Sequence, residues 1–339
     1  MSLPFTVRPY HPGDDAGIVS LFNEVFTEDD PHFRPRSVDD WRWEFLRNPA
    51  GTTIFVGVAS DGRIISQYAC LPAFAHLRGE RVRAIQGIDS VVHRDYRRGL
   101  RREGAFLATA RAFLDYWGVP ERHAFGWGFP NKKVYRIGVG ILGYQPLDVP
   151  VPALFRNLFQ HATDNAIALG VAEEASIVEL DRFDERVDRL FAELMPEYPL
   201  AVWRDSSYLN WRYADCPLAA YRSFAILRPS GDLRALAVVR LDWQGRPIVA
   251  VPEWLVPAAD LGAAGALLRH ILRVAREGGQ VRVEMWQSPR SAHFQVLRSL
   301  GLDQEPGLYN LCVMPYRRDL TLEDFRRDFR YSLGDVDVF

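Results

Sequence analysis

The feature that most constrains the fold of this chain is a degenerate internal repeat. Residues 43–49 (WEFLRNP) have a counterpart in residues 211–217 (WRYADCP), with tryptophan and proline at the same separation. Each copy precedes a strand–turn–strand pattern, and the order of the later elements also repeats. We therefore predict an α/β protein of two similar halves in tandem, residues 1–150 and 151–339, each a mixed, mostly antiparallel sheet flanked by helices.

Local patterns indicate where elements begin and end in each half. Asp61-Gly62 between two apolar runs predicts a β-hairpin, and the turn at 229–232 predicts its counterpart in the second half. Ser37 followed three residues later by Asp40 is a capping box, which predicts the start of a helix. The other elements expected are a strand over 82–92, a helix over 101–116 that stops at Gly118, and helices over 183–195 and 261–276.

Residues 87–102 (GIDSVVHRDYRRGLRR) are the segment most indicative of chemistry. A strand runs into a turn that contains glycine and five arginines between Arg94 and Arg102, directly before a predicted helix. A helix N-terminus presents unpaired N–H groups and the positive end of the dipole, and glycine lets a phosphate approach the backbone. The segment thus predicts a pyrophosphate site. The alternative is a helix start with its arginines facing water.

Residues 91–100 (VVHRDYRRGL) resemble the segment V-x-P-x-Y-R-G-x-G-L of the GNAT acyltransferase superfamily. The resemblance implies an acyl-CoA site built on a strand, an Arg/Gly-rich loop and a helix, and no metal. The R-x-x-G-x-G/A spacing is one residue short if Arg97 and Gly99 are its anchors, while residues 101–104 restore R-x-x-G later in the chain. The residues implied to bind the cofactor here are Val91, Val92, Arg97, Arg98, Gly99, Leu100, Arg101 and Arg102.

A second segment, 125–131 (FGWGFPN), followed by Tyr135 and 142–144 (LGY), resembles the "G-F-P-N … L-G-F/Y" ending of one GNAT branch. In that fold the strand before Asn131 splays from the preceding strand and opens a V-shaped slot for pantetheine. Residues 209–213 (LNWRY) are similar to the second half of the same branch, which acylates cell-envelope sugars and natural products. No arginine precedes the glycines of 256–265, so we expect no second CoA.

The resemblance also implies catalytic roles. Asp89 lies where such folds often keep a carboxylate, and it is expected either to take the proton of the amine or to form a salt bridge at the strand end. The backbone N–H of Val91 or Val92 would hold the thioester carbonyl. Tyr135 is the candidate acid for the thiolate, although the family's tyrosine usually comes about seven residues after the asparagine, where Gly138 stands here. Asn131 either caps a helix or touches pantetheine.

Composition limits the partners of the protein. The 41 Lys and Arg residues nearly balance 43 Asp and Glu, for a formal net charge of −2, so we expect no binding to nucleic acid. The three cysteines are far apart and follow no disulfide or zinc-ligand spacing. No signal peptide and no membrane span are expected, because no apolar run approaches about eighteen residues. A cytoplasmic monomer or homodimer is the expectation.

These observations predict an N-acyltransferase that moves an acetyl or other acyl group from acyl-CoA to the amine of a small molecule, such as an amino sugar or a natural-product amine. One alternative is a non-catalytic acyl-CoA-binding or scaffold protein, which would bind CoA without turnover. A second keeps the tandem fold but takes an acyl or aminoacyl group from a carrier protein or tRNA. A basic path leading away from the arginine cluster would favour this second alternative.

Overall fold

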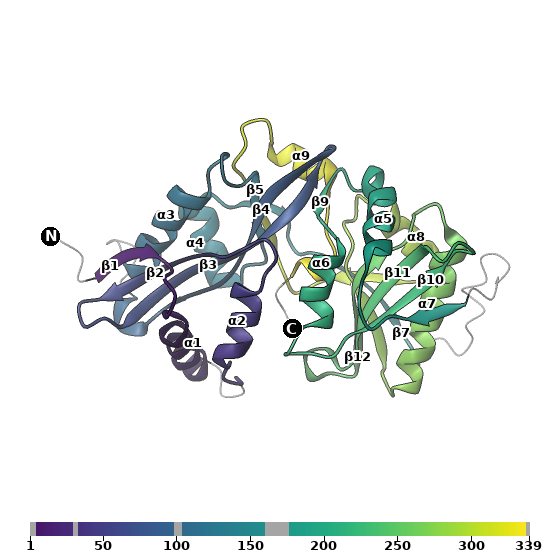
Figure 1. Ribbon diagram of the computed structural model, residues 1–339, viewed down its shortest axis with the longest axis horizontal. Helices are drawn as coiled ribbons and strands as arrows, with labels where there is room; N and C mark the ends of the chain where they lie inside the picture. Colours follow the sequence, from purple (N-terminus) through teal and green to yellow (C-terminus); the bar gives the residue numbers. More distant parts are fainter. Residues whose placement is uncertain (1–4, 30–32, 98–103, 160–175, 337–339) are drawn as a thin grey trace. The chain divides into compact units, whose positions relative to one another are not determined.

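The computed structural model describes residues 5–29, 33–97, 104–159 and 176–336, which form two compact units (Figure 1). The first unit contains the described residues of Met1–Phe74, Val82–Pro146 and Cys312–Leu322. The second contains those of Ala75–Arg81, Leu147–Leu311 and Glu323–Phe339. The predicted boundary near residue 150 divides the chain once. In the structure the two halves also exchange segments, since residues 75–81 belong to the second unit and residues 312–322 to the first.

The sheet of the first unit is mixed, as expected. Its strand order is β1-β2-β3-β4-β5-β15-β6, in which β4 and β5 pair in parallel, while β1-β2, β2-β3 and β5-β15 are antiparallel. β15 comes from late in the chain, and it joins this unit because Cys312 pairs with Gly128 of β5. The strand bounds are β1 Phe5–Pro9, β2 Thr53–Ala59, β3 Ile64–Leu77, β4 Glu80–Val92, β5 Phe125–Gly128, β6 Gln145–Asp148 and β15 Leu311–Pro315.

Helices cover both faces of this sheet (Figure 1), with α3 and α4 on one face and α1 and α2 on the other. The predicted capping box is confirmed, since the Ser37 hydroxyl accepts from the Asp40 N–H at the start of α2. α3 ends at Gly118 as predicted, but the structure has it begin after Gly104, later than residue 101. The helix bounds are α1 Asp15–Asp29, α2 Val38–Leu46, α3 Ala105–Trp117 and α4 Lys132–Ile137, which continues as the π-helical turn η2, Gly138–Leu142.

The second unit repeats this architecture. Its sheet has the order β14-β7-β13-β12-β11-β10-β8, with β12 and β13 parallel and the other pairs antiparallel. The predicted turn at 229–232 connects β10 to β11. The strand bounds of this sheet are β7 Pro152–Asn157, β8 Ile177–Glu179, β10 Arg222–Leu227, β11 Leu233–Arg240, β12 Ile248–Leu255, β13 Arg282–Met285 and β14 Asp303–Pro306. Two short strands, β9 Leu200–Val202 and β16 Phe329–Arg330, pair in parallel with each other, and β9 also pairs with the end of β3.

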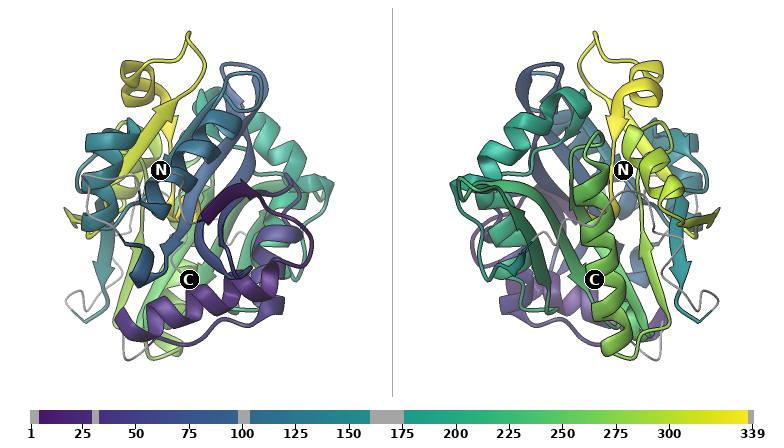
Figure 2. Two further views of the ribbon diagram at one scale, coloured as in Figure 1. Left: turned by 90° about the vertical axis from the view of Figure 1, so that its left-hand side faces the viewer. Right: turned by 90° about the vertical axis from the view of Figure 1, so that its right-hand side faces the viewer.

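Two apolar layers enclose the second sheet. α7 and α8 pack on one face through residues such as Leu268 and Phe294, and α5 packs on the other through Phe191. Figure 2 shows α7 lying along the sheet. No helix in the described ranges is long and apolar enough to cross a bilayer. The helix bounds are α5 Glu185–Leu194, α6 Ser206–Leu209, which continues as the π-helical turn η5, Asn210–Ala214, then α7 Leu261–Glu277, α8 Ala292–Ser299, α9 Leu322–Asp328 and the 3-10 turn η7, Leu333–Asp335.

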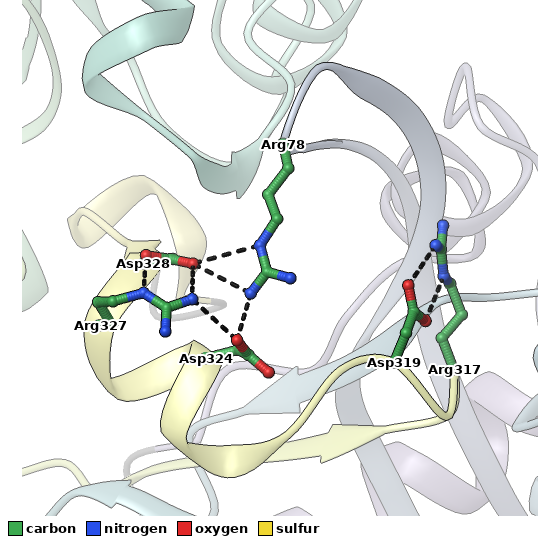
Figure 3. A network of polar contacts seen from close by, with 6 residues as sticks. All are labelled: Arg78, Arg317, Asp319, Asp324, Arg327 and Asp328. Carbon is green, nitrogen blue, oxygen red and sulfur yellow. Dashed lines mark hydrogen bonds and ion pairs between the residues drawn. The ribbon is translucent and has the colours of Figure 1, made fainter.

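An ion-pair network fixes the tip of the β3–β4 hairpin within the second unit (Figure 3). Arg78 donates to Asp324 and, at 3.2 Å, to Asp328 of α9. Arg327 contacts the same two carboxylates at 2.8 and 2.7 Å. The backbone N–H of Arg78 also donates to the Pro199 carbonyl at 2.7 Å, so the hairpin tip is held by both side-chain and main-chain bonds. Figure 3 also draws a local ion pair of the first unit, in which Arg317 lies 2.6 Å from Asp319.

Candidate active site

The centre of the candidate site is the point where β4 and β5 stop pairing. Their parallel register runs from Ala84 opposite Phe125 to Gly87 opposite Gly128, and it ends there. The two glycines allow close approach, because a Cβ on Gly128 would lie 3.2 Å from the Gly87 carbonyl oxygen. β4 continues to Val92, whereas the chain after β5 turns into α4. The two strands therefore stop pairing shortly before Asn131, where the resemblance implies that they splay.

The N-terminus of α3 lies beside the end of β4. Ala105, the first residue of α3, packs in one apolar cluster with Val92 and Tyr96. The helix is also tied to β3, since the hydroxyls of Ser66 and Thr109 are 2.6 Å apart. The first N–H groups of a helix have no partner within the helix, and together with the positive end of the dipole they can bind an anion near the end of β4.

The predicted cofactor residues are only partly described. Val91 is buried against α1, and Val92 is half-buried. Arg97 is exposed, and its Nε donates to the Val92 carbonyl at 3.1 Å, which places its side chain at the end of β4. The remaining predicted residues of the phosphate loop, Arg98, Gly99, Leu100, Arg101 and Arg102, lie outside the described residues.

Asp89 stands two residues beyond the last β4–β5 pair and has an unusual backbone, with φ of +46°. A non-glycine residue in the left-handed region costs free energy, of order 1 kcal/mol, and such residues gather at functional sites. The Asp89 carboxylate forms an ion pair with Arg36, whose Nη1 also lies 3.1 Å from Oε2 of Glu44. Asp89 thus forms a salt bridge, one of the two roles expected from the sequence. Its neighbours in this cluster, Arg36 and Glu44, were not predicted.

Glu44 carried a sequence signal that was not used. It lies between Trp43 and Phe45 in the repeated motif, and all three side chains are almost completely buried. A carboxylate placed among core aromatics of a helix is seldom buried unless it is paired. The partner, Arg36, is not adjacent to Asp89 in sequence, and only tertiary structure brings the two together.

Asn131 and Tyr135 lie at the start of α4. The Asn131 side chain accepts from the Val134 N–H at 3.0 Å, so it caps this short helix, as one of its two predicted roles requires. Tyr135 is half-buried one turn further on. Gly138 occupies the position where the family usually has tyrosine, and a Cβ there would lie 2.3 Å from the ring of Tyr144. The Tyr144 ring therefore takes the space beside Gly138.

The Tyr144 hydroxyl is hydrogen-bonded to that of Tyr68 on β3. Burial raises the pKa of both phenols above the ordinary value of tyrosine. Cys70 and Cys312 are buried strand residues, and burial raises the pKa of both thiols. Residues 5–29, 33–97, 104–159 and 176–336 contain no group of three or more His, Cys, Asp or Glu residues placed to hold a metal ion.

In the second unit the corresponding strands also diverge. The β12–β13 register ends at Val251 opposite Met285, and β12 continues to Leu255. Here the chain's own C-terminal segment packs beside β12: Ser332 forms a bridge with Gln287, and a Cβ on Gly334 would lie 2.3 Å from a carboxylate oxygen of Glu253. Protein atoms thus occupy the space next to β12 in this unit.

Comparisons with known proteins agree with this geometry. Residues 6–136 match the model of the family described as "Acetyltransferase (GNAT) domain". A probable N-acyltransferase of unknown function from Enterococcus faecalis V583 has a TM-score of 0.67 at 12% identity, covering 95% of this chain and 74% of that one. A tandem GNAT protein from the clavulanic acid biosynthesis pathway has a TM-score of 0.53 at 14% identity, covering 93% of this chain and 100% of that one.

A third solved structure extends the range of acyl groups among similar folds. Saccharomyces cerevisiae N-myristoyltransferase with bound myristoyl-CoA has a TM-score of 0.56 at 14% identity, covering 93% of this chain and 80% of that one. The comparison with curated proteins gave no match. At these identities the solved structures establish the fold of the chain, which is that of tandem GNAT proteins.

Proposed function

We propose that the protein is an N-acyltransferase that moves an acyl group, most simply acetyl, from CoA to the amine of a small molecule, because residues 6–136 match the model of a GNAT acetyltransferase domain. The divergence of β4 and β5 after Gly87 and Gly128 carries this proposal, since it leaves the edge of β4 next to the N-terminus of α3. Pantetheine would lie along that edge. The pyrophosphate would bind at the start of α3 with Arg97 and the arginines that follow it.

In the proposed reaction the neutral amine nitrogen attacks the thioester carbonyl carbon, a C–N bond forms and the C–S bond breaks. Asp89 takes the proton that the ammonium loses, through a water molecule. A backbone N–H of Val91 or Val92 donates to the carbonyl oxygen as negative charge develops there. As the amide forms, the nitrogen releases its second proton; Tyr135 gives a proton to the thiolate of CoA and takes up the one from the nitrogen. The products are an amide and the free thiol of CoA, and Asp89 passes the first proton to solvent, so atoms and charge balance without a metal ion.

Two similar folds guide the choice of acyl donor. One is an N-myristoyltransferase with bound myristoyl-CoA, and the other is a tandem GNAT protein whose structure was solved without AcCoA. The assay therefore incubates the full chain with acetyl-CoA or myristoyl-CoA and a set of amines that includes amino sugars, and mass spectrometry detects the amide. Amine-dependent amide formation supports the proposal. CoA binding without product on any amine would favour the non-catalytic alternative.

The phosphate site gives a sharper test. The double variant Arg97→Glu/Arg98→Glu is expected to weaken CoA binding at least about tenfold, because loss of a charge-assisted hydrogen bond costs roughly 1.5 to 3 kcal/mol. Isothermal titration calorimetry with CoA measures the affinity and the number of molecules bound, expected to be one per chain. The matched control is Arg246→Glu/Arg273→Glu, two exposed arginines of the second unit. Equal affinity in the folded test and control variants would refute the proposed site.

A further inference from the structure

Three charged side chains meet on the α1–α2 side of the diverging strands. Arg36 precedes α2 and contacts carboxylates from two different elements, Asp89 of β4 and Glu44 of α2. The side chains of these three residues are 17%, 13% and 3% exposed, respectively. One guanidinium therefore serves two carboxylates, and the cluster of Arg36, Asp89 and Glu44 has a formal charge of −1. We call it the Arg36 cluster.

Contacts on every side fix the position of Arg36. Its backbone N–H donates to Oδ1 of Asn23 at 2.9 Å, and its carbonyl accepts from Nδ2 of the same residue at 2.9 Å. Its guanidinium lies 4.6 Å from the centre of the Phe22 ring. Because both backbone groups and the side chain are held by α1, the guanidinium is fixed before either carboxylate reaches it.

Gln67 of β3 adds an acceptor to the same place. Its Nε2 donates to the backbone carbonyl of Asp89 at 2.8 Å, which supports the left-handed conformation of that residue. The side chain is 1% exposed, and its Oε1 has no hydrogen-bond partner within the described part of the chain. A buried carbonyl oxygen without a donor is costly, and an incoming N–H group would satisfy it.

Resting on the proposed function, we infer that Arg36 is a positioning residue that holds Asp89 and Glu44 beside the acyl-CoA slot, and that the resulting negative charge selects acceptors that arrive as cations. The charge follows from the count of groups: two carboxylates against one guanidinium. Gln67 Oε1 accepts a hydrogen bond from the acceptor's ammonium group. Asp89 is the catalytic residue of the cluster, whereas Glu44 and Arg36 act through charge and orientation.

The inference predicts opposite effects for the two positions. Glu44→Gln keeps the shape of the side chain but brings the cluster to neutrality, so it should weaken binding of a cation. Arg36→Gln makes the cluster more negative but frees Asp89 from its fixed position, so it should lower the rate without weakening binding of a cation. Arg36→Lys keeps the charge and should restore part of that rate.

The test compares 1,4-diaminobutane, a dication, with hydroxylamine, which is neutral at pH 7.5, as acceptors of the acetyl group. For Glu44→Gln we expect the KM of the diamine to rise at least tenfold and that of hydroxylamine to change less than twofold. For Arg36→Gln we expect kcat to fall at least tenfold with both acceptors, with no rise in the KM of the diamine. Equal KM changes for both acceptors in Glu44→Gln, or a higher diamine KM in Arg36→Gln, would overturn the inference.

Binding measurements separate this inference from the proposed function. Calorimetric titration of 1,4-diaminobutane into the unmodified chain and into Glu44→Gln needs no turnover, and a tenfold weaker affinity in the variant is expected even if no acyl transfer is found. Equal affinities would refute the Arg36 cluster as a cation site. The affinity for CoA, measured in the same variants, should stay unchanged. If the unmodified chain did not bind CoA, the proposed function would be refuted, but the cation site would not.

Discussion

Arg204 is a buried charge of the second unit with two buried carboxylate partners. Its Nε lies 2.9 Å from Glu253, and its Nη2 donates to Asp335 at 2.8 Å. The side chain is 5% exposed, and those of both carboxylates are 2% exposed. Burial opposes the charge of Arg204, but Asp335 and Glu253 outweigh it and raise its pKa. Burial also raises the pKa of Glu253, although Arg204 opposes the shift.

We therefore expect Arg204→Met to destabilise the second unit strongly and in a pH-dependent way. Without the guanidinium, two carboxylates remain buried together, and the folded state must protonate one of them. Protonating a carboxyl of ordinary pKa costs about 1.36 kcal/mol per pH unit, or about 4.4 kcal/mol at pH 7.5 and about 1.6 kcal/mol at pH 5.5. The first value agrees with the about 3 to 5 kcal/mol lost when one partner of a buried ion pair is removed.

The sign of the pH effect follows from linkage. In the variant the folded state holds a proton that the unfolded chain has released at pH 7.5, so its free energy of unfolding falls as pH rises. Urea unfolding followed by circular dichroism at pH 7.5 and pH 5.5 measures the loss at each pH. We expect the loss to shrink by about 2.7 kcal/mol at the lower pH.

The matched control is Arg182→Met. Arg182 forms a 2.7 Å ion pair with Asp215 in the same unit, but both side chains are largely exposed, and solvent screens such pairs. The control should not change stability measurably at either pH. If Arg204→Met behaved like the control, or if its loss were the same at both pH values, the argument from buried carboxylates would be wrong.

Two further predictions concern single side chains. Arg156 is buried and donates to the Gly301 carbonyl at 3.0 Å, while its two other nitrogens have no partner in the described chain. Arg156→Met should therefore leave the free energy of unfolding in urea unchanged or raise it by about 1 kcal/mol. A loss of stability above about 2 kcal/mol would contradict this expectation. Asp89→Asn should lower turnover about a hundredfold while the affinity for CoA stays constant. The loss of turnover should shrink as pH rises, because the amine then deprotonates unaided. Near-normal rates throughout a pH-rate profile would rule out Asp89 as the proton acceptor.

Local sequence determined the elements that depend on neighbouring residues. The capping box of Ser37 and Asp40, the hairpin at Asp61-Gly62 and the end of α3 at Gly118 all follow from short-range hydrogen bonds or backbone freedom, and the structure confirms each. The capping role of Asn131, one of its two predicted roles, is local as well, because its side chain accepts from an N–H only three residues away. The repeated Trp-x5-Pro motif likewise predicted the tandem architecture.

Tertiary structure alone decided which charges meet. Arg36 contacts Asp89 across 53 positions of sequence, and β15 joins β5 from the far end of the chain, because sheet pairing and helix packing act over distances that local patterns do not encode. The same holds for the buried network of Arg204, which joins β12 to the C-terminal segment. The sequence predicted an acyl-CoA site at the end of β4, whereas only the fold shows that Arg36 and Glu44 meet Asp89 of that strand. Buried charged side chains need partners, and packing decides which ones they meet.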